Sequence, residues 1–442
     1  MKRKILATAL SAVMAASLFV GCGSGSNGSG SDSGSKDGVQ EIRWMFWDDL
    51  EATSDKISLG YKETIERFNK DYEGKYHVTP VTTNLEEYYT KLNAEIQGGE
   101  APDVFICSPG PQLSDYVIPD GSNPEDGLCL PLDEYLEKDG WKDTFRLEDD
   151  VFKQQTYDGK IYAIPLNTAA ACCFYNTEMF EKAGITEVPT DFDGLLDACA
   201  KLKDAGYTPI TISASTAWCL SMVAGYLCES EGVDLEKLAD GSASWEDGKL
   251  EAACEKLIKL SKYFQESAAG DTNDVATANF YNEEAAILIQ GSWAIGQING
   301  ENEDFGNNKC GVFQFPGVKK IIAKSDSLCV SKDTKSPEAC VALLKYFTDE
   351  TAQKYTAEEG GKMPVTKIEF DESKAPAELA YVKDVFDNAE GTFGFYNESM
   401  PTTETGSHFD DTMVSVFLGD LTPAEAAKDM EEYYEENCRN QE

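Results

Sequence analysis

The sequence predicts an α/β protein made of two packed units, and three observations carry this prediction. The chain has 442 residues, which is enough for two lobes that each bury their own core. Residues 42–107 alternate between strand-like and helix-like segments, an order typical of a parallel sheet with helices on its faces. Residues 157–184 read as an extended passage that leaves one packed unit and starts another.

The first unit opens with a β-α-β-α-β pattern. Apolar strand-like runs cover 42–47, 77–83 and 104–107, and apolar residues at helical spacing cover 61–72 and 85–96. We expect Asn84 to cap the second helix and Trp44 to lie in the core. Ligands of parallel sheets bind beyond the carboxyl ends of the strands, which is where Trp47, Asp48 and Ser108 fall.

The extended passage contains two short apolar runs, 161–165 and 169–175, which are too short for ordinary helices. The pair Asp158-Gly159 before them is typical of a turn. Pro165 cannot donate a hydrogen bond to a sheet, so it fits a break between the two runs. A short helix then ends at Gly184.

The second unit mixes helices and strands in a less regular order. Thr190 and Asp193 match a capping box before an apolar stripe that ends at Gly206. Ser336-Pro337 and Thr422-Pro423 each place a capping residue before proline in the first helical position. The further expected elements are a strand at 208–212, helices at 216–227 and 250–264, an apolar segment at 280–289 and a strand at 325–330.

The N-terminal segment has the layout of a secretory signal, with basic residues 2–4 before an apolar run that ends at Val20. The sequence from Leu18 to Cys22 resembles a bacterial lipobox, in which the cysteine is lipidated; the alternative is an ordinary signal followed by an incidental cysteine. Residues 23–38 are rich in Gly and Ser and predict a flexible tether. Two acyl chains on Cys22 would suffice for stable membrane anchoring.

The composition excludes several functions. The formal net charge of −41 repels nucleic acid and anionic lipid headgroups, so neither is an expected partner. Only two histidines are present, and no P-loop, GxSxG or HExxH motif occurs. We therefore expect no catalytic residues, no metal site and no cofactor.

Thirteen cysteines occur in the chain, and none shows the CxxC spacing of zinc or thioredoxin-like sites. Export permits disulfides. The apolar surroundings of Cys107, Cys199, Cys329 and Cys340 instead favour small buried hydrophobic side chains with free thiols.

Several sequence runs, taken together and in order, resemble a known family. They are the Trp-rich first strand, residues 68–104 (FNKDYEGKYHV and EEYYTKLNAEIQGGEAPDV within it), 157–185 (YDGKIYAIP and FYNTEMFEKAGI), 188–202, 285–298 (AAILIQGSWAIGQI) and 336–353. These runs are similar to those of extracellular solute-binding proteins of the sugar-binding group, which serve ABC importers. The resemblance covers nearly the whole chain after the tether.

The resemblance implies a two-lobed, periplasmic-binding-protein-like fold of type II, with a hinge of several strands and the solute held between the lobes. It divides the chain into a signal peptide (1–21), Cys22 with its tether (22–38), a first lobe (40–166 with 318–362) and a second lobe (167–317 with 363–442). The implied function is capture of a mono- or oligosaccharide and its delivery to an ABC permease. We expect a monomer that is exported and lipid-anchored to the outer face of the cytoplasmic membrane.

Sugars present apolar faces and hydroxyl rims, so a sugar site needs aromatic platforms together with polar groups. The candidate ligand-binding residues are Trp47, Asp48, Ser108, Thr168, Trp218, Trp293, Met363 and Tyr396. Trp293 follows the Gly-x-Trp pattern of the family, and for this residue we favour a role in the binding site over simple packing. For Trp47 and Trp218 packing remains an equal alternative, as does a strand-end cap for Asp48.

Three other functions remain open on the sequence. A peptide or a polyamine could replace the sugar, because the acidic surface and Asp48 suit a cation. A surface enzyme acting on glycosides would use paired carboxylates, but the adjacent pairs Asp48-Asp49 and Glu283-Glu284 point their side chains apart. A structural or adhesive protein would show neither ligand-dependent stabilisation nor lobe closure.

Overall fold

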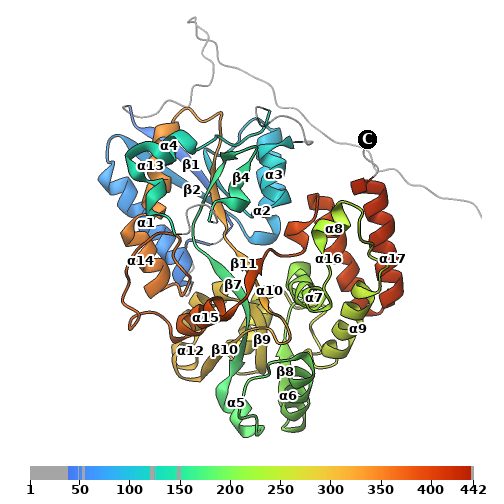
Figure 1. Ribbon diagram of the computed structural model, residues 1–442. Coiled ribbons are helices and arrows are strands. Elements are labelled where there is room, and N and C mark those ends of the chain that lie inside the picture. Colours follow the sequence, from blue (N-terminus) through green and yellow to red (C-terminus); the bar gives the residue numbers. More distant parts are fainter. Residues whose placement is uncertain are drawn as a thin grey trace, which may run out of the picture.

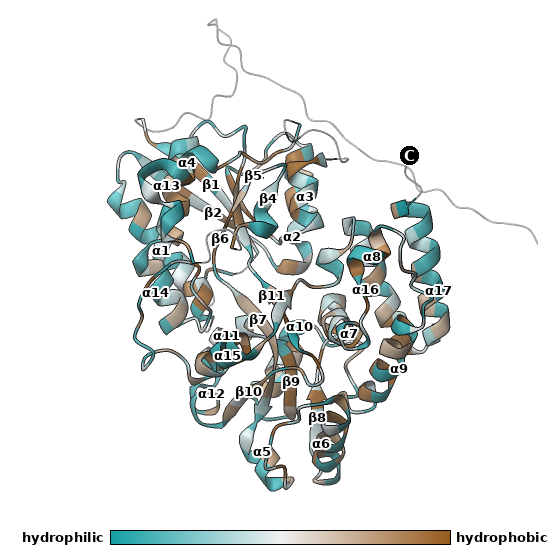
Figure 2. Ribbon diagram, in the orientation of Figure 1, coloured by the Kyte–Doolittle hydropathy of each residue, from teal (hydrophilic) through white to brown (hydrophobic). Residues whose placement is uncertain are grey.

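Two large β-sheets form the centres of two lobes in the computed structural model (Figure 1), which describes residues 38–47, 49–51, 55–119, 124, 126–146 and 151–439. The predicted signal peptide, Cys22, the tether up to residue 37 and Asp48 lie outside the described residues. Hydrophobic residues concentrate on the strands inside each lobe and hydrophilic residues on the outer helices (Figure 2). This layered arrangement agrees with the predicted α/β fold.

The first lobe is built on a five-stranded sheet with the order β2-β1-β3-β12-β6. Strands β1, β2 and β3 run parallel, as the β-α-β-α-β pattern predicts, whereas β12 runs antiparallel to both of its neighbours. The strands are β1 (Gln40–Phe46), β2 (Tyr76–Thr82), β3 (Val104–Cys107), β6 (Ala163–Pro165) and β12 (Ser327–Val330), with the small hairpin β4 (Thr156–Tyr157) and β5 (Lys160–Ile161) beside them.

Helices cover the first sheet on both faces, and their termini follow the local sequence. Asn84 accepts a hydrogen bond from the backbone of Glu87 and caps α2, as predicted. Trp44 is fully buried, which confirms its predicted place in the core. The helices are α1 (Lys56–Asp71), α2 (Leu85–Gln97), α3 (Pro111–Val117), α4 (Asp133–Glu137), α13 (Pro337–Phe347) and α14 (Glu350–Glu358).

The second lobe is built on a six-stranded mixed sheet with the order β13-β11-β7-β9-β8, in which β10 also pairs with β7. Its strands are β7 (Ala169–Asn176), β8 (Thr208–Thr211), β9 (Ala285–Gly291), β10 (Cys310–Phe313), β11 (Lys320–Lys324) and β13 (Gly391–Phe393). Strand β7 is antiparallel to β9, β10 and β11, so a strand at the lobe boundary organises the sheet.

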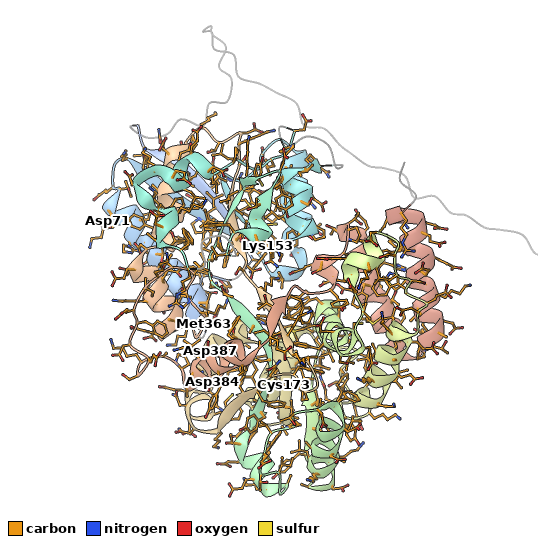
Figure 3. The ribbon with its side chains drawn as sticks, in the orientation of Figure 1. Asp71, Lys153, Cys173, Met363, Asp384 and Asp387 are labelled. Carbon is orange, nitrogen blue, oxygen red and sulfur yellow. The ribbon has the colours of Figure 1, made fainter. Side chains whose placement is uncertain are left out.

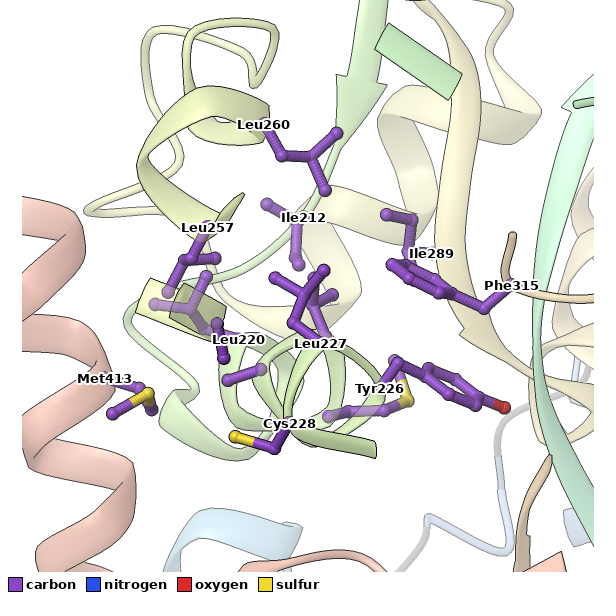
Figure 4. Packing of buried hydrophobic residues seen from close by; sticks show 14 of the residues in the cluster. Ile212, Leu220, Tyr226, Leu227, Cys228, Leu257, Leu260, Ile289, Phe315 and Met413 are labelled. Carbon is purple, nitrogen blue, oxygen red and sulfur yellow. The ribbon is translucent and has the colours of Figure 1, made fainter. Parts of the chain in front are cut away.

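The helices of the second lobe come from two separated parts of the chain. Its helices are α5 (Thr177–Lys182), α6 (Phe192–Asp204), α7 (Ala217–Glu231), α8 (Leu235–Ala239), α9 (Lys249–Ser261), α10 (Asn273–Tyr281), α11 (Ile295–Glu301), α12 (Glu303–Lys309), α15 (Ala377–Asn388), α16 (Thr403–Leu418) and α17 (Pro423–Tyr434). Helix α7 is buried along most of its length (Figure 4), because the sheet, α9 and α16 surround it. The hydroxyl of Tyr226 on α7 donates to the carbonyl of Ala171 over 2.7 Å.

Two details of the second lobe differ from the sequence prediction. The cap of α6 is Asp191, which accepts from the backbone of Gly194, and not Thr190. The expected apolar segment 280–289 is divided between the end of α10 and strand β9. Thr190 and Asp191 are adjacent and both are good capping residues, so the sequence alone did not show which of them caps α6.

The sheet pairing moves two predicted lobe boundaries. Strand β11 pairs with β7, so the chain returns to the first lobe after Lys324 and not near Val318. After Met363 the chain still bonds to the first lobe: Arg146 N–H donates to the carbonyl of Val365, and Lys367 N–H to that of Thr144. Both corrections concern extended segments whose lobe depends on distant pairing partners.

The cysteines occupy the interior. All twelve cysteines among the described residues carry free thiols, and eleven of them are buried. Cys107, Cys199, Cys329 and Cys340 are fully buried, which confirms the prediction that they act as small hydrophobic side chains. None of the helices in the described part of the chain combines the length and apolar composition needed to cross a bilayer.

Candidate functional site

The segments that pass between the lobes lie side by side and hold each other through backbone hydrogen bonds. Thr168 and Met363 exchange two such bonds, of 2.9 and 3.2 Å, and Met363 is labelled between the lobes in Figure 3. Leu166 N–H donates to the carbonyl of Asp326 over 3.0 Å. The hydroxyls of Thr168 and Ser325 are 3.3 Å apart. The predicted residues Thr168 and Met363 therefore meet at the hinge, linked through their backbones.

Three aromatic side chains meet in the second lobe and form what we call the aromatic cluster: Trp218, Trp293 and Phe395. The ring centroids are 6.0 Å apart for Trp218 and Trp293, 6.0 Å for Trp218 and Phe395, and 5.9 Å for Trp293 and Phe395. Trp218 lies in the first turn of α7, and Trp293 lies in a 3₁₀ turn directly after β9. Both tryptophans are half-buried, so part of each indole stays exposed to solvent.

Glycine makes room for one of these rings. A Cβ atom at Gly291 would collide with the six-membered ring of Trp293, two residues along the chain. The family-like Gly-x-Trp pattern thus has a local physical reason here, because only glycine lets the indole fold back over the strand end. The two predicted tryptophans are brought together, and Phe395 completes the cluster.

A lysine links the aromatic cluster to the first lobe. Lys324, at the end of β11, places its Nζ 5.4 Å from the centroid of the Phe395 ring. The same ammonium group donates to Ser108 Oγ over 3.0 Å and to Glu398 Oε1 over 2.7 Å, and it lies 3.3 Å from Asp326 Oδ1. Burial lowers the pKa of Lys324, but the carboxylates of Asp326 and Glu398 outweigh burial, so the pKa is raised and the lysine is charged.

The residues that follow the first-lobe strands divide into two groups. Ser108 faces the second lobe, because its hydroxyl accepts from Lys324. Its backbone N–H donates to the hydroxyl of Tyr89 over 3.0 Å. Trp47 packs behind it against Tyr88 and Tyr89, with centroid distances of 5.3 and 6.2 Å, and is only 9% exposed. For Trp47 the geometry favours the packing alternative that the sequence left open.

Tyr396 does not belong with the other candidates. The side chain is 3% exposed, its hydroxyl donates to the carbonyl of Val233, and its ring packs against Phe393 and Phe409. Every side of this residue is therefore occupied by the second-lobe core, and its neighbour Phe395 joins the aromatic cluster instead. Alternation along the extended segment explains the change, because successive side chains point to opposite sides.

Sequence reasoning missed Phe395, Lys324 and Glu398. Phe395 had a detectable signal, since it is an aromatic residue beside a candidate in the run Phe393 to Tyr396. Lys324 had none, because strand β11 itself was not predicted and two of its partners, Ser108 and Glu398, are 216 and 74 residues away along the chain.

The side chains at this junction suit noncovalent binding. Aromatic faces, a charged donor, hydroxyl groups and carboxylate acceptors are the groups that bind polyhydroxylated molecules. Burial raises the pKa of Glu398, while the Lys324 ammonium group acts in the opposite direction. Among the described residues no group of three His, Cys, Asp or Glu side chains is arranged to hold a metal ion.

Comparison with known proteins gives consistent matches. Residues 63–380 match the family model described as bacterial extracellular solute-binding protein. An uncharacterized ABC transporter extracellular-binding protein of Pyrococcus horikoshii is 30% identical over 230 residues; this match covers 50% of the present chain and 52% of that relative, about half of each. A multiple sugar-binding protein of Streptococcus mutans is 24% identical over 356 residues, covering 73% of the present chain and 79% of the relative.

A solved structure from a study of xylan utilization by Caldanaerobius polysaccharolyticus has the same fold. It superimposes with a TM-score of 0.80 and 26% identity, and the match covers 89% of the present chain and 99% of that structure. The comparison confirms the predicted two-lobed fold.

Proposed function

This chain belongs to the family of bacterial extracellular solute-binding proteins, and from this premise we propose that it captures a carbohydrate between its lobes and delivers it to an ABC permease. The observation that carries the proposal is the aromatic cluster of Trp218, Trp293 and Phe395 beside the charged Lys324, at the point where the second lobe meets Ser108 of the first. Aromatic faces stack on the apolar faces of sugar rings, and the polar groups orient the hydroxyls.

The relatives support the choice of a sugar over other solutes. One is a multiple sugar-binding protein, and the structural neighbour comes from a study of xylan utilization. A mono- or oligosaccharide is consistent with both of these similar proteins and with the half-exposed indoles of Trp218 and Trp293. The proposed contacts are Trp218, Trp293, Ser108 and Lys324, with the hinge residues Thr168 and Met363. Phe395 is 3% exposed and packs against the two indoles, so it is expected to position them.

The proposal also includes export, membrane anchoring and the absence of enzymatic activity. Capture requires export, and we propose that the N-terminal segment directs it and that Cys22 carries the lipid anchor. Binding would need no chemistry on the solute, so we propose a monomeric binding protein without enzymatic activity. Closure of the lobes on the solute would generate the form that docks on the permease, since a ligand shifts a two-state equilibrium through its higher affinity for one state.

Titration of purified protein tests the proposal. A thermal-shift panel of xylo-, malto-, chito- and galacto-oligosaccharides should contain a sugar that raises Tm, and isothermal titration calorimetry should then give a one-to-one stoichiometry. Release of new reducing ends during incubation would contradict the nonenzymatic assignment. A panel in which spermidine or a peptide raises Tm and every sugar leaves it unchanged would replace the sugar with that solute.

A further inference from the structure

The lobes touch each other directly, beside the aromatic cluster. The loop after β3 and helix α3 in the first lobe contact the turn at Asn397–Ser399 and the start of α16 in the second. Two side-chain hydrogen bonds cross this boundary: Lys324 Nζ to Ser108 Oγ, 3.0 Å, and Thr403 Oγ1 to Asp115 Oδ2, 2.6 Å. Thr403 and Asp115 lie on separate lobes, whereas Lys324 comes just before Ser327, which pairs with Cys107 beside Ser108 at the hinge.

The backbone at Gly110 lies directly against the second lobe. A Cβ atom there would collide with the carbonyl oxygen of Glu398, whose carbonyl carbon would lie 3.1 Å away. The obstructing atoms are main-chain atoms, so a flexible side chain cannot move aside to make room. Any side chain at position 110 would therefore force the two segments apart.

Each side of this contact is fixed to its own lobe. The hydroxyl of Tyr157 donates to the carbonyl of Gly110 over 2.9 Å and ties the loop to the first lobe. On the second lobe the side chain of Asn397 accepts from the backbone N–H of Glu398 and donates to Asp410 of α16, each over 3.0 Å. A shift at position 110 is therefore transmitted to whole lobes.

We infer that these residues form an interlobe latch that stabilises the contact of the two lobes without help from the solute, and that Gly110 sets their distance of closest approach. The latch consists of Ser108, Gly110 and Asp115 in the first lobe and Lys324, Glu398 and Thr403 in the second. The latch partners bond to one another, so the stabilisation is present before any solute arrives. Its role in capture rests on the proposed function, but its effect on lobe separation does not.

Small-angle X-ray scattering of the solute-free protein tests the inference. Gly110→Val should increase the radius of gyration relative to the wild type, because its side chain separates the lobes. Gly159→Val is the control with the same substitution, since Gly159 also has a positive φ of 72° in the first lobe but has no atoms within 4 Å of the added Cβ. The control introduces the same side chain at a glycine of positive φ, without an interlobe clash, and should leave the radius of gyration unchanged.

A second variant removes the latch bonds without adding volume at Gly110. The double variant Lys324→Met with Thr403→Val should also increase the radius of gyration, by less than Gly110→Val, and circular dichroism checks that all variants are folded. Equal radii of gyration for the wild type and both latch variants would overturn the inference. Sugar titrations test the proposed function independently of the latch. If the latch variants increase the radius of gyration but the protein binds no sugar, the inference stands and the proposed function is wrong.

Discussion

The two lobes use their aromatic side chains in different ways. In the first lobe Trp44 is fully buried, with Phe46, Tyr61 and Phe347 around it at centroid distances of 4.7 to 6.3 Å. In the second lobe Trp218 and Trp293 are half-buried and meet at the boundary between the lobes. The first set stabilises a core, and in the proposed function the second presents ring faces to a solute.

The difference shows that an aromatic residue at the end of a strand is not by itself a binding residue. Trp47 and Trp293 both follow strands, yet Trp47 packs on Tyr88 and Tyr89 whereas Trp293 folds back over Gly291. The space available around the ring decides its role. The solute's stacking contacts are therefore expected mainly from the second lobe, with polar groups such as Ser108 coming from the first.

Removal of the central aromatic residue of the first lobe should have the largest effect. Trp44→Ala should lower the free energy of unfolding by about 3–5 kcal/mol, because it leaves a large cavity in a tightly packed interior. Urea denaturation followed by far-UV circular dichroism measures the loss. A change below about 1 kcal/mol would contradict the assignment of this cluster to the core.

Stability should depend on pH through the second lobe. Glu378 on α15 is fully buried, and burial raises its pKa from 4.5 to about 7, while hydrogen bonds, including those from Asn299 and Cys310, act in the opposite direction. The folded state keeps this proton between pH 4.5 and 7 and the unfolded state loses it, so the contribution of Glu378 to stability is highest below pH 4.5 and falls as pH rises to about 7. The loss should be roughly 3 kcal/mol.

Replacement of the acid checks this sign. Glu378→Gln should be more stable than the wild type at pH 8 and should lose most of the pH dependence of the urea midpoint. Burial also raises the pKa of Asp410 in the same lobe to about 7, so Asp410→Asn is measured in parallel. A midpoint that changes with pH between 5 and 7 in the same way for Glu378→Gln and the wild type would contradict the prediction.

The aromatic cluster should carry affinity and little stability. Trp293→Ala should weaken binding of the sugar found in the panel by about 2 kcal/mol, roughly thirtyfold, because it removes a stacking face. Isothermal titration calorimetry measures this change, and Tm should stay close to that of the wild type. Trp47→Phe serves as the first-lobe counterpart and should change affinity less than threefold; a loss as large as that of Trp293→Ala would place Trp47 in the site.

The β-α-β-α-β part of the first lobe could be predicted from the sequence, whereas the strands β10, β11 and β13 of the second lobe could not. The β1 to β3 region follows from periodicity and capping, because β1 pairs with the two strands that follow it in the chain. Strands β10, β11 and β13 were missed, since their pairing partners lie far away in sequence. The same limit hid Lys324, whose partners Ser108 and Glu398 lie far away along the chain.

The two Ser/Thr-Pro helix starts give a matched pair, one in each lobe, with the smallest expected effect. Thr422 accepts from the backbone of Glu425, whose carboxylate accepts from Thr422 in return, so α17 begins with a complete capping box. Ser336 begins α13 with the same Pro in the next position but makes no side-chain capping bond. Thr422→Ala should therefore lower the free energy of unfolding by about 1 kcal/mol, and Ser336→Ala by less than about 0.5 kcal/mol. Urea midpoints of both variants measure the difference, and equal losses would show that the sequence pattern, and not the bond, sets the stability of the helix start.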